Sequence, residues 1–101
     1  MSDLDNEIRD LREKTDQNRR QFLLADVELC FIAIERAKLE LSLGKTDEAR
    51  KEYLIASRGA DVIERFLREA AAEKVADIKP KLRDLRSSLK SLRAELGTTA
   101  D

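Results

Sequence analysis

The 101-residue sequence lacks histidine and tryptophan and contains one cysteine, one proline and three glycines. Without histidine, the commonest general base and metal ligand is missing, and a Cys–His nucleophile pair cannot form. The lone Cys30 supplies neither an intrachain disulfide nor a zinc cluster. The glycines are too far apart to form a phosphate-binding loop. These absences predict a non-enzymatic protein with no catalytic residues, no cofactor and no metal ligands.

Long apolar runs are also missing, so no segment is predicted to span a membrane. The first residues are acidic and contain no apolar run, so a signal peptide is not expected. With the single thiol, this favours a cytoplasmic protein. The net charge is −1, so no overall field attracts the molecule to nucleic acid or to an anionic membrane.

What the sequence does contain is 41% charged and 42% hydrophobic residues, and the hydrophobic ones recur in steps of three and four. This spacing places side chains on one side of a helix. In the first segment, about residues 3–43, one stripe consists of Leu4, Ile8, Leu11, Phe22, Ala25, Leu29, Ile32, Leu39 and Leu43. From residue 22 a second stripe runs beside it, formed by Leu23, Val27, Cys30, Ile34, Ala37 and Leu41. A face of double width predicts that residues 22–43 pack against two helices, and that residues 1–20 form a protruding extension.

Boundaries of the later helices follow from glycine and proline. Gly44 can end the first helix in a left-handed conformation and Thr46 can cap the next, predicted at about 46–76. The stretch from Asp61 to Glu64 resembles a capping box after Gly59, but the stripe continues in phase, which favours one continuous helix. Asp77 is the expected cap of a third helix at about 78–96, with Pro80 tolerated in its first turn.

Short connections between these helices require neighbours to run antiparallel. The predicted fold is therefore all-α, a single domain (1–101) formed by an antiparallel three-helix bundle with a long N-terminal helix extension. Because the second helix is too short to cover the whole first helix, the extension has no partner within the chain. We expect Leu4, Ile8 and Leu11 to bury themselves against a second copy, which predicts a homodimer.

A row of cations distinguishes the third helix. Each follows a residue of its apolar stripe by one position, and the row, called here the basic strip, consists of Lys79, Arg83, Arg86, Lys90 and Arg93. In one interpretation these side chains cover the apolar seam and pair with acids such as Glu28 and Glu35 on a neighbouring helix. In a second, they bind an acidic amphipathic helix of another protein. Binding of nucleic-acid or lipid phosphates is less favoured, because no aromatic residue accompanies the cations.

The stretch from Ala37 to Ala56, with Leu43-Gly44, Ala49 and Tyr53, resembles the turn and second helix of a tetratricopeptide repeat. Only one repeat-length unit is visible, so no solenoid is expected. Residues 22–96 are also similar to microtubule-interacting and trafficking domains, which are three-helix bundles. That resemblance implies binding of short amphipathic helices in a groove beside the third helix, where the basic strip would select acidic ligands.

The sequence as a whole predicts a protein-interaction or scaffold module, with Arg83, Arg86 and Lys90 as the first residues to test. Two alternatives stay open. The chain can be a coiled-coil assembly element whose partner is itself, or a phosphate-backbone binder that acts through the third helix.

Overall fold

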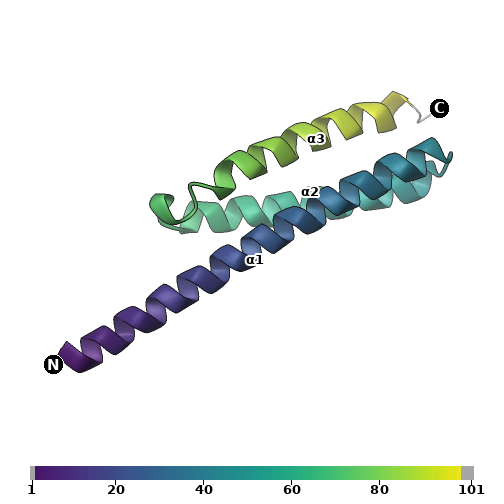
Figure 1. Ribbon diagram of the computed structural model, residues 1–101. Coiled ribbons are helices and arrows are strands. Elements are labelled where there is room, and N and C mark those ends of the chain that lie inside the picture. The colour runs from purple at the N-terminus through teal and green to yellow at the C-terminus, as the bar shows by residue number, and fades with distance from the viewer. Residues whose placement is uncertain (1, 99–101) are drawn as a thin grey trace.

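The computed structural model describes residues 2–98, apart from the side chains of residues 2, 12, 16 and 98. It contains α1 (Ser2–Ser42), α2 (Thr46–Glu69), a short 3-10 helix η1 (Ala72–Lys74) and α3 (Ile78–Thr98), and residues 2–98 include no strand. The molecule measures 68 × 18 × 15 Å, and the N-terminal part of α1 projects beyond the other helices (Figure 1). The all-α helical bundle is therefore confirmed, while residues 1 and 99–101 of the expected domain lie outside the described range.

The turn between α1 and α2 depends on Gly44, whose φ of 76° is unfavourable for any residue with a side chain. This conformation lets the Gly44 N–H donate to the carbonyl of Leu41 (3.0 Å) and the Lys45 N–H donate to that of Glu40 (2.8 Å). Lys45, not Thr46, occupies the cap position of α2, and no side chain caps this end. The turn is short, so α2 runs back along α1.

α2 continues through Gly59 but ends at Glu69 instead of at about residue 76. Alanines 70–72 favour helix, yet Ala70 is extended and the chain turns through η1. The early end lets Val75 and Ile78 reach the core, where they are 3% and 0% exposed. Burial of these two side chains outweighs the local propensity of the alanines.

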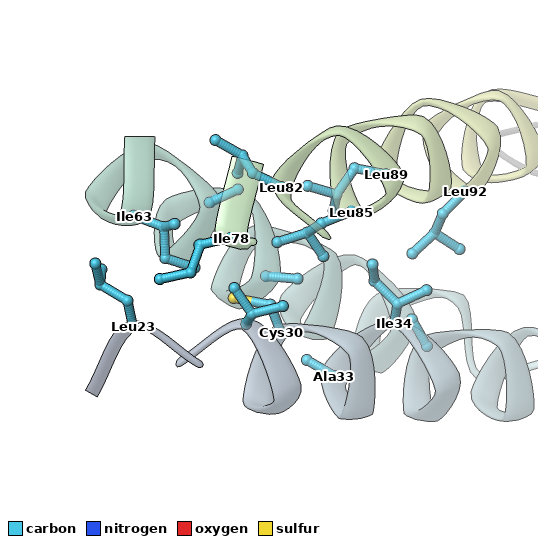
Figure 2. Packing of buried hydrophobic residues seen from close by; sticks show 14 of the residues in the cluster. Leu23, Cys30, Ala33, Ile34, Ile63, Ile78, Leu82, Leu85, Leu89 and Leu92 are labelled. Atoms are coloured by element: carbon cyan, nitrogen blue, oxygen red, sulfur yellow. The ribbon is translucent and has the colours of Figure 1, made fainter. Parts of the chain in front are cut away.

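The core is formed by all three helices and contains only hydrophobic side chains among the described residues. α1 contributes its second stripe, whose members Leu23, Cys30 and Ile34 face α2 and α3 in Figure 2. α3 contributes the leucines that follow its apolar spacing, and the same view shows them turned toward the other helices: Leu82, Leu85, Leu89 and Leu92.

Small residues allow α1 and α2 to approach closely. The buried alanines at this contact and elsewhere in the core are Ala33, Ala37, Ala49, Ala56 and Ala60. At Gly59 the helices are close, because a Cβ added there would overlap with Sγ of Cys30. The absence of a side chain at Gly59 thus makes room for the Cys30 side chain across the helix contact.

Candidate interaction surface

The first apolar stripe of α1 lies on the surface of the chain. Its large side chains are between 43% (Ile8) and 71% (Phe22) exposed, and we call them the outer stripe: Leu4, Ile8, Leu11, Phe22, Leu29, Ile32, Leu39 and Leu43. The expectation that residues 22–43 bury both stripes is therefore wrong. Only the second stripe is covered within the chain.

Helix geometry explains this division. Successive residues are about 100° apart around a helix, so over residues 22–43 the outer stripe lies about 100–180° from the centre of the buried stripe. α2 and α3 both contact α1 from the side of Val27 and Ile34. One side of α1 is consequently occupied by two helices, and the opposite side, equally apolar in spacing, faces solvent.

The N-terminal extension has little contact with the rest of the chain. Every described side chain from Asp3 to Phe22 is exposed, including Leu4, Ile8 and Leu11. The segment after α2 reaches this level of α1 only near residues 13–20, where Glu13 and Gln17 line a shallow hollow with Glu73 and Lys74. Burial of Leu4, Ile8 and Leu11 in a homodimer stays a prediction.

One ion pair joins α1 to the start of α3. The guanidinium of Arg20 donates to both carboxylate oxygens of Asp77, with a distance of 3.4 Å between Nε and Oδ1. This hydrogen bonding lowers the pKa of Asp77 and raises that of Arg20. Asp77 stands directly before Ile78, the first residue of α3, as expected for a cap, and its side chain also joins this end of α3 to α1.

The outer stripe meets a second apolar feature near its middle. Phe66 of α2 lies across a hollow of about 220 Å³ from Phe22, with Leu23, Arg19 and Asp26 as the other lining residues. Phe66 is 44% exposed, and at helical spacing from it Ile55 and Val62 are exposed as well. The apolar surface of α1 therefore extends onto the adjoining side of α2.

The basic strip on α3 is divided by the structure. Arg86 is half-buried and its Nη2 lies 2.9 Å from Oδ1 of Asp61 and 3.1 Å from Oε2 of Glu64. Arg86 does pair with a neighbouring helix, but with these α2 acids and not with Glu28 or Glu35. The other four cations are exposed and form no ion pair with the residues that the structure describes: Lys79, Arg83, Lys90 and Arg93.

The leucines beside the basic strip are not available to a ligand. Leu85 and Leu92 are fully buried, and Leu82 and Leu89 nearly so, beneath the chain's own α1 and α2. A helix bound at this edge would contact cations without an apolar seam. In the sequence Asp61 and Glu64, which bind Arg86, only resemble a capping box within a continuous helix. Their long-range role has no local signal, because it depends on where α3 lies.

Chemistry at the remaining candidates is limited. Burial and the neighbouring Asp26 raise the pKa of the Cys30 thiol, which favours the unreactive protonated form. Among residues 2–98, no three His, Cys, Asp or Glu side chains that the structure describes lie close enough to hold a metal ion. None of the described helices combines the length and apolar character needed to cross a membrane.

Comparisons with protein-family models, with curated proteins and with solved structures found no match.

Proposed function

We propose that this chain is a non-enzymatic protein-interaction module that binds its partner through the outer stripe of α1. The observation that carries the proposal is the exposure of eight large hydrophobic side chains along one side of the chain, three before residue 12 and five from residue 22 onward. Scattered apolar residues are normal on protein surfaces, but exposed apolar side chains aligned along a helix about 60 Å long mark an interaction surface.

The size of the exposed surface supports this proposal energetically. Burying a Leu, Ile or Phe side chain completely contributes roughly 1.5–3 kcal/mol, and about half of each outer-stripe side chain is still in contact with water. Covering all eight would contribute about 8 kcal/mol, and a partner with a comparable face would add a similar amount. The total exceeds or matches the roughly 4–15 kcal/mol that association costs.

The basic strip supports a binding role less well. Its central member Arg86 already has two carboxylate partners on α2. The remaining cations lie on an edge whose leucines are covered, so they supply charge without an apolar anchor. An exposed ion pair between one of these cations and an acidic residue of a partner would contribute about 0–1 kcal/mol.

The test of the proposal replaces two outer-stripe leucines, Leu29→Glu with Leu39→Glu, in the full chain. Both side chains are about 60% exposed on the side of α1 away from the core, so circular dichroism should show an unchanged helical fold. Immobilised wild-type protein should capture its partner from a lysate of its source cells, and the double variant should lose that capture. A charge placed in a buried apolar interface is strongly unfavourable.

The matched control is Leu54→Glu, which alters an exposed leucine of α2 outside the outer stripe. This variant should capture as much partner as the wild type. A second control, Arg83→Glu with Lys90→Glu, reverses charge on the basic strip and should also leave capture intact. Equal capture by the outer-stripe variant and the wild type would contradict the proposal, and loss of capture in the strip variant alone would assign binding to α3.

A further inference from the structure

The residues of the outer stripe occupy one heptad register along α1 and as far as Leu43, just after its end. Alternate steps of four and three lead from Leu4 to Leu43 through twelve positions, and the four not occupied by large apolar residues are Thr15, Asn18, Ala25 and Arg36. Two helices with this repeat can pack along their full length with knobs in holes. From this repeat, and resting on the proposed function, we infer that the partner is a second copy of this chain, bound antiparallel along α1.

The length of the surface argues for a second copy. The segment before residue 13 projects beyond the bundle and its described side chains are exposed on all sides, so its partner must be another elongated helix. In an antiparallel pair with full overlap, Leu4 faces the second copy's Leu43 and Ile8 faces its Leu39. Each extension then covers the exposed outer stripe of the other copy's bundle, and both ends of the stripe gain a partner.

Side-chain size is matched at the centre of this arrangement. The two-fold axis passes between residues 23 and 24, so Phe22 faces the second copy's Ala25. By symmetry, Ala25 faces the second copy's Phe22. Phe22 is the most exposed of the outer-stripe residues, and Ala25 leaves room for it. The hollow between Phe22 and Phe66 lies beside the same axis. A large residue opposite a small one is the arrangement that fills such a layer.

Charges beside the outer stripe select the antiparallel orientation. With full overlap, Lys14 lies next to the second copy's Glu35 and Arg19 next to its Asp26, and symmetry forms each pair twice. This register also places Asp5 next to the second copy's Glu40 at each end, which is a contact between like charges. Of these six side chains, Asp26 and Glu40 are partly exposed, and the other four are exposed.

The alternatives bring more like charges together. In a parallel pair, Lys14 lies beside the second copy's Arg19 and Glu35 beside its Glu40, while Arg36 faces its own counterpart within the apolar seam. Sliding the antiparallel pair by one heptad brings either Glu28 or Arg19 against itself. Like charges at these positions oppose association and determine orientation and register in coiled coils.

Disulfide trapping tests the orientation. In a Cys30→Ala background, Ile8→Cys with Leu39→Cys in one chain should form a covalent dimer within minutes under mild oxidation. Residues 8 and 39 of one chain are about 46 Å apart along α1, so they cannot pair within it. Each single variant should stay uncrosslinked, because antiparallel packing keeps identical positions equally far apart. Crosslinking of the single variants would show a parallel pair and overturn the inference.

A charge exchange tests the register without new cysteines. Lys14→Glu should weaken dimerisation of the full chain about tenfold by sedimentation equilibrium, and Glu35→Lys should do the same. The two changes together should restore the wild-type affinity. Positions 14 and 35 are about 30 Å apart within one chain, so rescue can only arise between copies. Additive weakening in the double variant would overturn the register.

The mass of the unaltered chain separates this inference from the proposed function. We expect a dimer at micromolar concentration that becomes monomeric in the Leu29→Glu, Leu39→Glu variant. A chain that stays monomeric at about 100 μM would overturn the inference, because a specific dimer should form below that concentration. If lysate capture still required the outer stripe in that case, the proposed function would stand with a different partner.

Discussion

Replacing Gly59 by alanine tests the close packing of α2 against Cys30 of α1. Gly59 lies in the interior of α2 with ordinary helical geometry, since the positive-φ glycine of the described residues is Gly44. On helix propensity alone, alanine should stabilise α2 by about 0.8–1 kcal/mol. The new methyl group, however, would overlap with Sγ of Cys30, which must then shift within the core because Cys30 is only 5% exposed.

The two effects have opposite signs, and their sizes decide the outcome. Overpacking a dense core costs about 1–3 kcal/mol, so the net change for Gly59→Ala should be a loss of roughly 0–2 kcal/mol. Cys30→Ala alone should cost about 1 kcal/mol, the value of one buried group of this size. In the Cys30→Ala background the clash disappears, and Gly59→Ala should then stabilise by up to about 1 kcal/mol.

A double-mutant cycle measures this coupling directly. Urea denaturation of the four proteins, followed by circular dichroism at one protein concentration, should give a coupling energy of about 1–3 kcal/mol in favour of the double variant. Gly97→Ala is the matched control, because nothing lies within 4 Å of an added Cβ there. A coupling energy near zero, or a gain in stability from Gly59→Ala with Cys30 present, would refute the packing argument.

Three further predictions concern the turn, the ion pair and the core. Gly44→Ala should lower the free energy of unfolding by about 1–2 kcal/mol, because an L side chain is strained at a φ of 76° even where space is open. Thermal melts measure this loss, with Gly97→Ala as the control variant. Asp77→Asn should destabilise the chain at neutral pH and have progressively less effect in acid. Arg20 lowers the folded-state pKa of Asp77 below its ordinary 3.8, so the stability that the pair supplies is present above pH 3.8 and is lost as the pH falls through the lowered pKa. Urea titrations of both proteins from pH 7 to pH 2 measure the difference in stability. A difference that stays constant over this range would contradict the prediction. Leu85→Ala should cost about 2–5 kcal/mol by chemical denaturation, whereas Leu54→Ala, at an exposed leucine, should stay within about 1 kcal/mol.

The helices were predictable because their apolar spacing is regular and their breaks use residues with strong local preferences. Gly44 and Pro80 act through their own backbone geometry, so the end of α1 and the start of α3 could be placed from the sequence. The end of α2 could not. Alanines 70–72 carry no stop signal, and the helix ends there because Val75 and Ile78 are buried farther along the chain.

The candidate site shows the same limit. Two adjacent apolar stripes on α1 look alike in sequence, and nothing local says which one faces α2 and α3. The contact is decided by fit across the interface, where Cys30 and Ala33 meet the small residues of α2. The steps of three and four that form the outer stripe can be read directly from the sequence. A broad core face and two separate faces give the same pattern until the neighbouring helices are placed.

The pairing of Cys30 with Gly59 also bears on how this thiol meets oxidants. The first product of cysteine oxidation carries one additional oxygen atom on sulfur, and the side of Sγ that faces Gly59 has no room for it. Because Cys30 is also buried, peroxide reaches the thiol more readily while α1 and α2 are apart. The rate at which peroxide consumes the thiol should consequently report how often this helical hairpin opens, without any label attached to the protein.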